Sequence, residues 1–130
     1  MFKQIATLLF VLLISSEEVN ASVRGTSITD SLYSTVLSEQ RHLLVHLPNN
    51  YEENKALDYP VLYLLDGQRN FAHTIGTLDL LNQSNMAQEM LIIAIKNTHR
   101  TRDFTPTYDE SYNEWGISGG ADDFLDFVEK

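Results

Sequence analysis

Two short apolar runs, separated by a helix-like segment, constrain the fold of this chain more than any other feature of its sequence. Residues 60–65 (PVLYLL) and residues 90–95 (MLIIAI) contain no charged side chain and are rich in branched and aromatic residues. A strand that is apolar on both faces is typical of a central strand in a sheet covered by helices. Between the runs, residues 70–83 can form a helix. The residues at helical spacing, which would share one face, are Phe71, Thr74, Ile75, Leu78 and Leu81. The sequence therefore predicts a strand, a helix and a second, parallel strand.

Residues 41–47 (RHLLVHL) predict a further strand because their side chains alternate between two faces. One face would carry Leu43, Val45 and Leu47, and the other His42, Leu44 and His46. Pro48 ends the strand, since proline cannot donate a hydrogen bond to a neighbouring strand. The preceding residues 22–40 are rich in serine and threonine and are expected to be either a leader or an edge strand.

The C-terminal part of the chain predicts a long loop followed by a helix. Residues 97–120 combine turn formers, charges and aromatics, and their length exceeds that of ordinary connections, which is typical of a working loop. Residues 121–130 (ADDFLDFVEK) open with two aspartates that suit the positive end of a helix. The expected apolar stripe of this helix is Phe124, Leu125 and Val128. The predicted fold class is α/β, with helices on both faces of the sheet.

Residues 1–21 are expected to be a secretory signal. Lys3 gives a positive start, residues 5–14 form an apolar run, and Val19-Asn20-Ala21 supplies a small-residue cleavage site. The apolar run is about half the length that a membrane-spanning helix needs. We expect cleavage after Ala21, export to the periplasm or the extracellular space, and no membrane attachment afterwards.

The acidic composition and the lack of cysteine exclude several kinds of partner and chemistry. The 130 residues carry 9 Lys and Arg against 18 Asp and Glu, so nucleic acid is not an expected partner. Without cysteine there is no disulfide, no thiolate metal site and no cysteine nucleophile. His42 and His46 share a strand face that we expect to be partly exposed, but no third ligand stands at metal-binding spacing. We therefore expect neither a metal nor another cofactor.

Four motifs stand in a fixed order along the chain. They are His46-Leu47-Pro48, residues 59–67 (YPVLYLLDG), residues 97–106 (NTHRTRDFTP) and residues 118–122 (SGGAD). In this order they resemble the Putative esterase family of α/β-hydrolases, which includes enterochelin-esterase-like and esterase-D-like enzymes. The resemblance extends from about Arg41 to the end of the chain and covers the N-terminal portion of the family's domain.

The resemblance implies a three-layer sheet of the α/β-hydrolase type, incomplete at its C-terminal end, with residues 41–130 as part of the domain. It also implies a serine hydrolase acting on a small-molecule carboxylic ester or thioester. In such enzymes a serine attacks the acyl carbon, a histidine takes its proton and an acid orients the histidine. The family's serine, acid and histidine normally lie C-terminal to Lys130. The chain alone is therefore predicted to be inactive.

Two other interpretations stay open beside a truncated esterase. The chain is either a non-catalytic remnant or substrate-binding module that keeps the family loop, or a fragment whose remainder is encoded elsewhere. A sheet that stops after its second buried strand leaves an apolar edge unpaired. Such a short piece is expected to be marginally stable, which favours the fragment over an independently folding module.

One serine formally matches a nucleophile motif. Residues 116–120 (GISGG) fit the pattern G-x-S-x-G, in which a strand runs into a sharp turn that exposes the serine. The preceding residues 108–115 (YDESYNEW) have no buried-strand character. We therefore interpret this stretch as a glycine-rich turn that opens a helix, with Ser118 near its cap.

The candidate site residues follow the two apolar runs. The resemblance assigns the main-chain N–H of Gln68 to the oxyanion hole, the alternative being an ordinary turn at Asp66 and Gly67. Substrate contacts are expected from Asp66, Gly67, Asn97, Arg100, Arg102 and Trp115. Arg100 or Arg102 would face a polar group of the substrate, whereas a network with Asp103 that only holds the loop is the alternative. Trp115 would wall a pocket or anchor the loop, and His99 is not expected to be the base.

Overall fold

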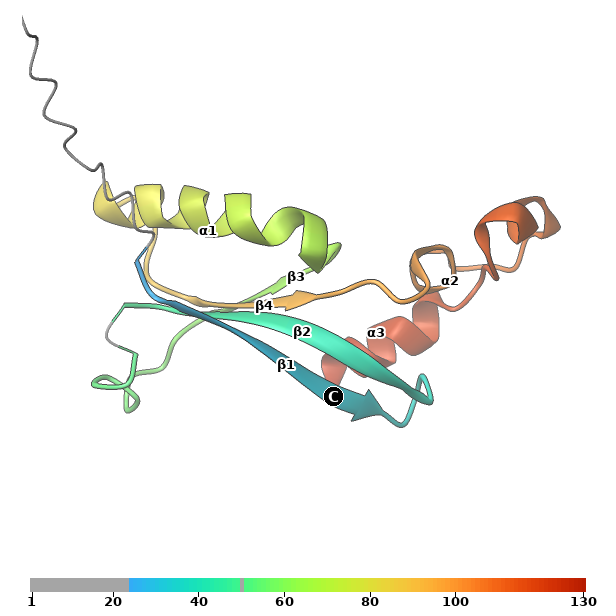
Figure 1. Ribbon diagram of the computed structural model, residues 1–130, viewed down its shortest axis with the longest axis horizontal. Helices are drawn as coiled ribbons and strands as arrows, with labels where there is room; N and C mark the ends of the chain where they lie inside the picture. The colour runs from blue at the N-terminus through green and yellow to red at the C-terminus, as the bar shows by residue number, and fades with distance from the viewer. Residues whose placement is uncertain (1–23, 50) are drawn as a thin grey trace, which may run out of the picture.

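The computed structural model describes residues 24–49 and 51–130, so the predicted signal at residues 1–21 lies outside the described residues. In the described chain three strands come first, followed by a helix, a fourth strand and three further helical segments (Figure 1). They are β1 (Thr26–Ser34), β2 (Glu39–Leu47), β3 (Val61–Leu64), α1 (Gly67–Gln83), β4 (Leu91–Ile95), α2 (Arg100–Phe104), the 3-10 helix η1 (Glu110–Trp115) and α3 (Ala121–Glu129). No helix in residues 24–49 and 51–130 combines the length and apolar character needed to cross a bilayer.

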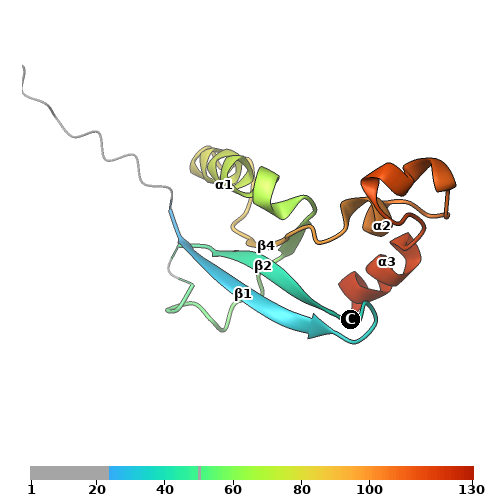
Figure 2. The same cartoon turned by 45° about the vertical axis from the view of Figure 1, so that its right-hand side comes forward.

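The four strands form one mixed sheet in the order β1-β2-β4-β3. β2 pairs antiparallel with β1 and with β4, while β3 and β4 are parallel. α1 lies over one face of the sheet and α3 lies against the other (Figures 1 and 2). The predicted α/β sheet with helices on both faces is thereby confirmed, and so is the parallel pair formed by the two apolar runs.

Strand alternation divides the sheet into an α1 face and an α3 face. Leu43 and Ile95 pack with Phe124 of α3 into one core cluster. On β4 the side chains of Ile92 and Ala94 point the opposite way, toward α1, and both are fully buried. The predicted alternation of residues 41–47 thus places Leu43 in the α3 core.

The stripe predicted for the last helix is wrong at one position. Phe124 is 3% exposed and Val128 packs against the core cluster, but Leu125 is 57% exposed. Phe127 packs in its place. The reason is the helical period: positions three and four beyond Phe124 stay on its face, whereas the next residue turns about 100° away.

Two other expectations are corrected by the topology. In the described sheet the strand at residues 60–65 is an edge strand rather than a central one, because α1 returns the chain to insert β4 between β2 and β3. Val61 and Tyr63 are exposed as a consequence. Residues 97–120 are also not a continuous loop, since they contain the two short helices α2 and η1.

The start of α1 depends on a close approach between two segments of main chain. Asp66 adopts a left-handed conformation (φ 52°) that turns the chain from β3 into the helix, three residues earlier than predicted. A Cβ on Gly67 would stand only 2.7 Å from the Ile95 carbonyl oxygen. Glycine therefore lets the turn at residues 66–68 lie directly against the C-terminal end of β4.

Candidate active site

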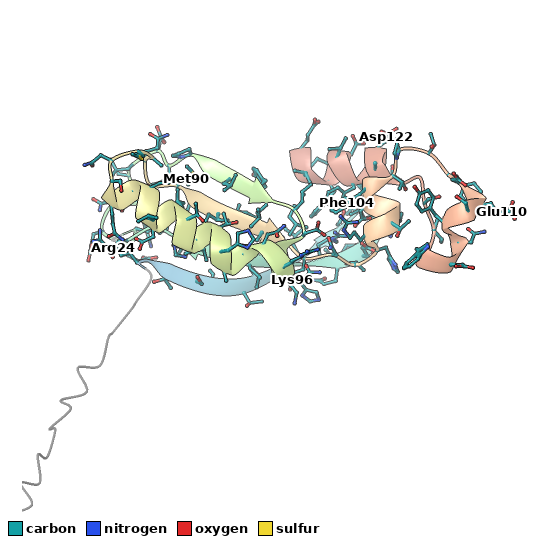
Figure 3. All side chains as sticks on the ribbon, turned by 90° about the horizontal axis from the view of Figure 1, so that it is seen from above. Arg24, Met90, Lys96, Phe104, Glu110 and Asp122 are labelled. Atoms are coloured by element: carbon teal, nitrogen blue, oxygen red, sulfur yellow. The ribbon has the colours of Figure 1, made fainter. Side chains whose placement is uncertain are left out.

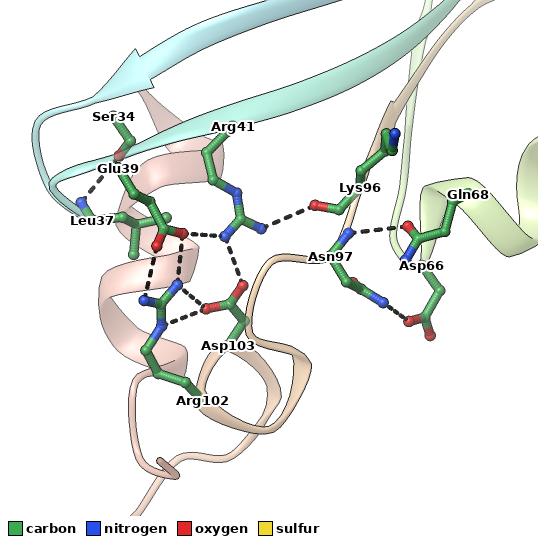
Figure 4. Close-up of polar contacts among 10 residues, drawn as sticks. All are labelled: Ser34, Leu37, Glu39, Arg41, Asp66, Gln68, Lys96, Asn97, Arg102 and Asp103. Carbon is green, nitrogen blue, oxygen red and sulfur yellow. Dashed lines mark hydrogen bonds and ion pairs between the residues drawn. The ribbon is translucent and has the colours of Figure 1, made fainter. Parts of the chain in front are cut away.

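The turn at residues 66–68 is joined by two hydrogen bonds to Asn97, the second residue after β4 (Figure 4). The main-chain N–H of Asn97 donates to Oε1 of Gln68 at 3.0 Å. The side-chain amide of Asn97 donates to the carboxylate of Asp66. Three of the predicted site residues thus meet at the carboxyl edge of the parallel strands, where α/β folds bind ligands.

Arg100, at the start of α2, is the second partner of this turn. Its Nε and one terminal nitrogen donate to the two carboxylate oxygens of Asp66 at 2.9 and 3.2 Å. The hydrogen bonds from Arg100, and then from Asn97, hold the pKa of the Asp66 carboxyl below its usual value. Because the Arg100 side chain is 64% exposed, the Asp66–Arg100 pair is accessible to solvent.

The main-chain N–H of Gln68 lies in the first turn of α1. No carbonyl of the helix itself can accept a hydrogen bond from this position. In the part of the chain that the structure describes, no other acceptor bonds to it either. A free N–H at the positive end of a helix, beside the carboxyl edge of the sheet, can donate to a negatively charged oxygen.

A second cluster of charges lies on the other side of Lys96 from the site, and Arg102 belongs to it (Figure 4). Arg102 donates to Glu39 at 2.7 and 3.1 Å and to Asp103 at 2.8 Å. Arg41 donates to Glu39 at 2.6 Å and to Asp103 at 2.8 Å. The structure therefore directs the Arg102 guanidinium to the network named above as the alternative, and not to the turn at residues 66–68.

This charge cluster is buried at its centre. Arg41 is 0% and Asp103 1% exposed. The hydrogen bond from Arg102 lowers the pKa of Glu39 to about 2, against the opposing effect of burial, and Arg41 adds to the lowering. The same ion pairs raise the pKa of Arg102. Glu39 and Arg102 therefore carry their charges at neutral pH.

Arg41 and Glu39 are site-related residues that the sequence interpretation missed. A signal for Arg41 was present: its position in residues 41–47 puts it on the same strand face as the buried Leu43. A charged side chain on an apolar face needs a buried partner of opposite charge. Asp103 was the available partner for Arg41 in the long loop, and Arg102 for Glu39, but a separation of about sixty positions in sequence hid both pairings.

Ser118 is a structural residue of the loop. Its Oγ accepts from the main-chain N–H of Asp109 at 2.8 Å and donates to the carbonyl of Asp109 at 3.2 Å. The side chain is buried, and the element directly before it is the 3-10 helix η1 rather than a strand. The glycine-rich turn is as expected, and Ser118 lies two residues before Gly120, the N-terminal cap of α3.

Trp115 is the last residue of η1. Seen from the end of β4, η1 lies on the far side of α2 (Figure 3). Its carbonyl accepts from Oγ1 of Thr101 at 3.2 Å, so the main chain here is tied to α2. The side chain itself is exposed, as are those of Tyr108 and Tyr112. The structure thus ties the main chain at Trp115 to the loop and leaves its ring accessible.

The histidines form no metal site within residues 24–49 and 51–130, where no group of three or more ligands comes together. His42 is exposed, as expected, but His46 is buried and bonds through Nδ1 to Oγ of Ser27 at 3.1 Å. Burial lowers the pKa of His46. His99 precedes α2 and contributes its carbonyl, which accepts from the N–H of Asp103.

These features define the class of protein: an α/β sheet protein with a parallel β3–α1–β4 unit and a candidate anion site at its carboxyl edge. The pattern of the Putative esterase family matches residues 34–130. The chain belongs to this family. A comparison with curated proteins gave no match.

Several solved structures have similar folds. An IroE-like serine hydrolase from Shewanella oneidensis shares 36% identity over 81% of this chain and 36% of its own length, with a TM-score of 0.73. The siderophore hydrolase EstA from Aspergillus nidulans (22%, TM-score 0.64) and the ferulic acid esterase AmCE1/Fae1A from Anaeromyces mucronatus (21%, TM-score 0.56) share the fold. These two matches cover 83% and 84% of this chain, respectively, and 41% of the length of each matched protein. It therefore spans less than half the length of these proteins.

Proposed function

We propose that this chain forms part of a carboxylic-ester hydrolase and supplies one arm of its oxyanion hole. The observation that carries the proposal is the free main-chain N–H of Gln68 at the start of α1. Attack on an ester carbonyl places negative charge on its oxygen, and a fixed N–H stabilises that charge as it develops. The family membership of the chain supports the reaction class.

The substrate is proposed to be a small-molecule ester or thioester, bound at the carboxyl edge of β3 and β4. The proposed contacts are Asp66, Gly67, Asn97, Arg100 and Trp115, while Arg102 is held in the charge cluster. Asn97 and Arg100 have the strongest support, because both bond directly to the turn that carries the Gln68 N–H. Arg100 keeps its charge beside an accessible carboxylate and could exchange that partner for a polar group of the substrate.

The reacting groups are proposed to lie outside residues 24–130. Ser118 is occupied by the main chain of Asp109, and the family's serine, acid and histidine are expected beyond Lys130. An oxyanion donor without a nucleophile and a base gives positioning but no attack. Residues 24–130 alone are therefore expected to be inactive.

We also propose that the protein is exported, with residues 1–21 as signal peptide and residues 41–130 as the N-terminal part of the hydrolase domain. The support is the charged start, apolar run and small-residue site at the N-terminus. Sequencing the N-terminus of the exported protein tests this directly. A mature chain that begins at Ser22 supports export, and retention of Met1 contradicts it.

The oxyanion role is tested by two substitutions of Gln68 in the full protein that the gene encodes. Gln68→Pro removes the N–H while proline remains acceptable in the first turn of a helix. We expect kcat for a p-nitrophenyl ester to fall roughly 100- to 1000-fold. Gln68→Ala keeps the N–H and loses only the bond from Asn97, so kcat is expected to stay within about tenfold of the original.

Thermal unfolding of both variants controls for loss of fold. A proline variant that unfolds like the alanine variant but loses far more activity supports the proposal. Equal losses of kcat in two equally stable variants would show that the N–H of Gln68 has no part in the reaction.

A further inference from the structure

Residues 96–104 bridge the candidate site and the buried charge cluster, and we call them the bridging segment. On one side the segment bonds to the turn at residues 66–68 through Asn97 and Arg100. On the other side Asp103 and the Lys96 carbonyl of the segment bond to Arg41, and its Arg102 bonds to Glu39. The position of the turn is thus linked to a residue that does not touch it.

Arg41 holds the bridging segment near both ends. One terminal nitrogen donates to the Asp103 carboxylate at 2.8 Å, and the other lies 3.4 Å from the carbonyl oxygen of Lys96 (Figure 4). Lys96 directly precedes Asn97. Arg41 is 0% exposed, and its guanidinium stands 5.3 Å from the Phe124 ring.

The arginine is itself fixed in place from several sides. Glu39 accepts from the same nitrogen that bonds to Asp103. Phe127 covers the guanidinium at 5.6 Å. Within residues 24–49 and 51–130, Arg41 Nε is the one buried side-chain polar atom with no partner, so the fork is positioned by its two terminal nitrogens. A planar, always charged fork can bond a carboxylate and a carbonyl at once, which an ammonium cannot reproduce.

We propose that Arg41, paired with Asp103, is a positioning residue for the oxyanion turn: it fixes the bridging segment, whose Asn97 and Arg100 then fix residues 66–68. That this positioning serves catalysis rests on the proposed function. The connection from Arg41 to residues 66–68 rests on the hydrogen bonds alone. The cluster pairs two arginines with two carboxylates, and its link to the site runs through the hydrogen bonds of the bridging segment.

The test is the local behaviour of two main-chain amides, followed by NMR without any substrate. Asp103→Asn keeps the size of the side chain and removes the charge that Arg41 pairs with. The N–H of Asn97, which bonds to Gln68, is expected to exchange with solvent on the order of tenfold faster or more. The N–H signal of Gln68 is expected to shift with it.

Two further variants make the result interpretable. Arg41→Lys keeps the charge but loses the fork, and it is expected to change the same two amides even where Asp103→Asn proves too unstable to study. Glu52→Gln is the matched control, since it makes the same kind of change in the exposed Glu52–Lys55 pair. This control is expected to leave Asn97 and Gln68 unchanged.

The pattern across the chain decides the outcome. Selective changes at Asn97 and Gln68, with Ile92 and Ile75 in the α1 face of the core unchanged, support the proposal. Unchanged Asn97 and Gln68 amides in Arg41→Lys would overturn it. Equal acceleration at all four amides would also overturn it, because Arg41 would then stabilise the fold as a whole. Failure of ester hydrolysis would refute the proposed function and leave this result standing.

Discussion

Replacing Gly67 by alanine gives the sharpest test of the packing that creates the candidate site. The new Cβ would lie 2.7 Å from the Ile95 carbonyl oxygen and 2.8 Å from the Ala94 carbonyl carbon. Both contacts are with main chain inside a sheet, which cannot rotate away as a side chain can. Overpacking of this kind costs ~1–3 kcal/mol. Alanine's better helix propensity returns at most ~1 kcal/mol, so Gly67→Ala is expected to destabilise by ~1–2 kcal/mol.

The same helix offers a matched control. Gly76 lies on the exposed side of α1, and a Cβ there would meet nothing within 4 Å. Gly76→Ala is therefore expected to stabilise the chain by ~0.5–1 kcal/mol through helix propensity alone. Urea unfolding followed by circular dichroism measures both variants. The reasoning is refuted if the two substitutions change the free energy of unfolding in the same direction or by the same amount.

Two further predictions concern the charge cluster and the α3 core. The pKa of Glu39 falls from 4.5 to about 2 on folding, so its contribution to stability is complete above pH 4.5 and is lost as the pH falls toward 2. Because the carboxylate is partly open to solvent, we expect this loss of stability to be about 1–2 kcal/mol. Glu39→Gln is expected to remove the loss from the pH profile of urea unfolding. Identical pH profiles for the two proteins would contradict this. Phe124→Ala is expected to cost ~3–5 kcal/mol, whereas Leu125→Ala, on the exposed side of the same helix, should change stability by less than ~0.5 kcal/mol. Comparable losses in the two variants would show that α3 packs on a different face.

The elements of the fold could be predicted from local pattern wherever the pattern was strong. The apolar runs at residues 60–65 and 90–95 predicted the parallel pair, and the alternation of residues 41–47 predicted β2 and placed Leu43 in the core. The edge position of β3 could not be predicted in this way. It depends on which strands pair across the sheet, and a run of six apolar residues does not specify its neighbours.

The candidate site was predictable in part, for a similar reason. Asp66, Asn97 and Arg100 follow the two parallel strands, and parallel strands end at the same edge of a sheet. The direction of Arg102 was not predictable, because its partner Glu39 lies on a strand far away in sequence. The electrostatic attraction of a buried pair acts only after the fold has brought the two residues together.

The most direct test of the central claim is labelling with a fluorophosphonate probe, which reacts covalently with the activated serine of a serine hydrolase. The probe is applied to residues 22–130 and to the full protein that the gene encodes, including any coding sequence after the codon for Lys130. The account predicts no labelling of residues 22–130, and labelling of the full protein at a serine outside residues 24–130 that persists in Ser118→Ala. Labelling that Ser118→Ala abolishes, or a full protein that neither reacts with the probe nor hydrolyses esters, would contradict the account.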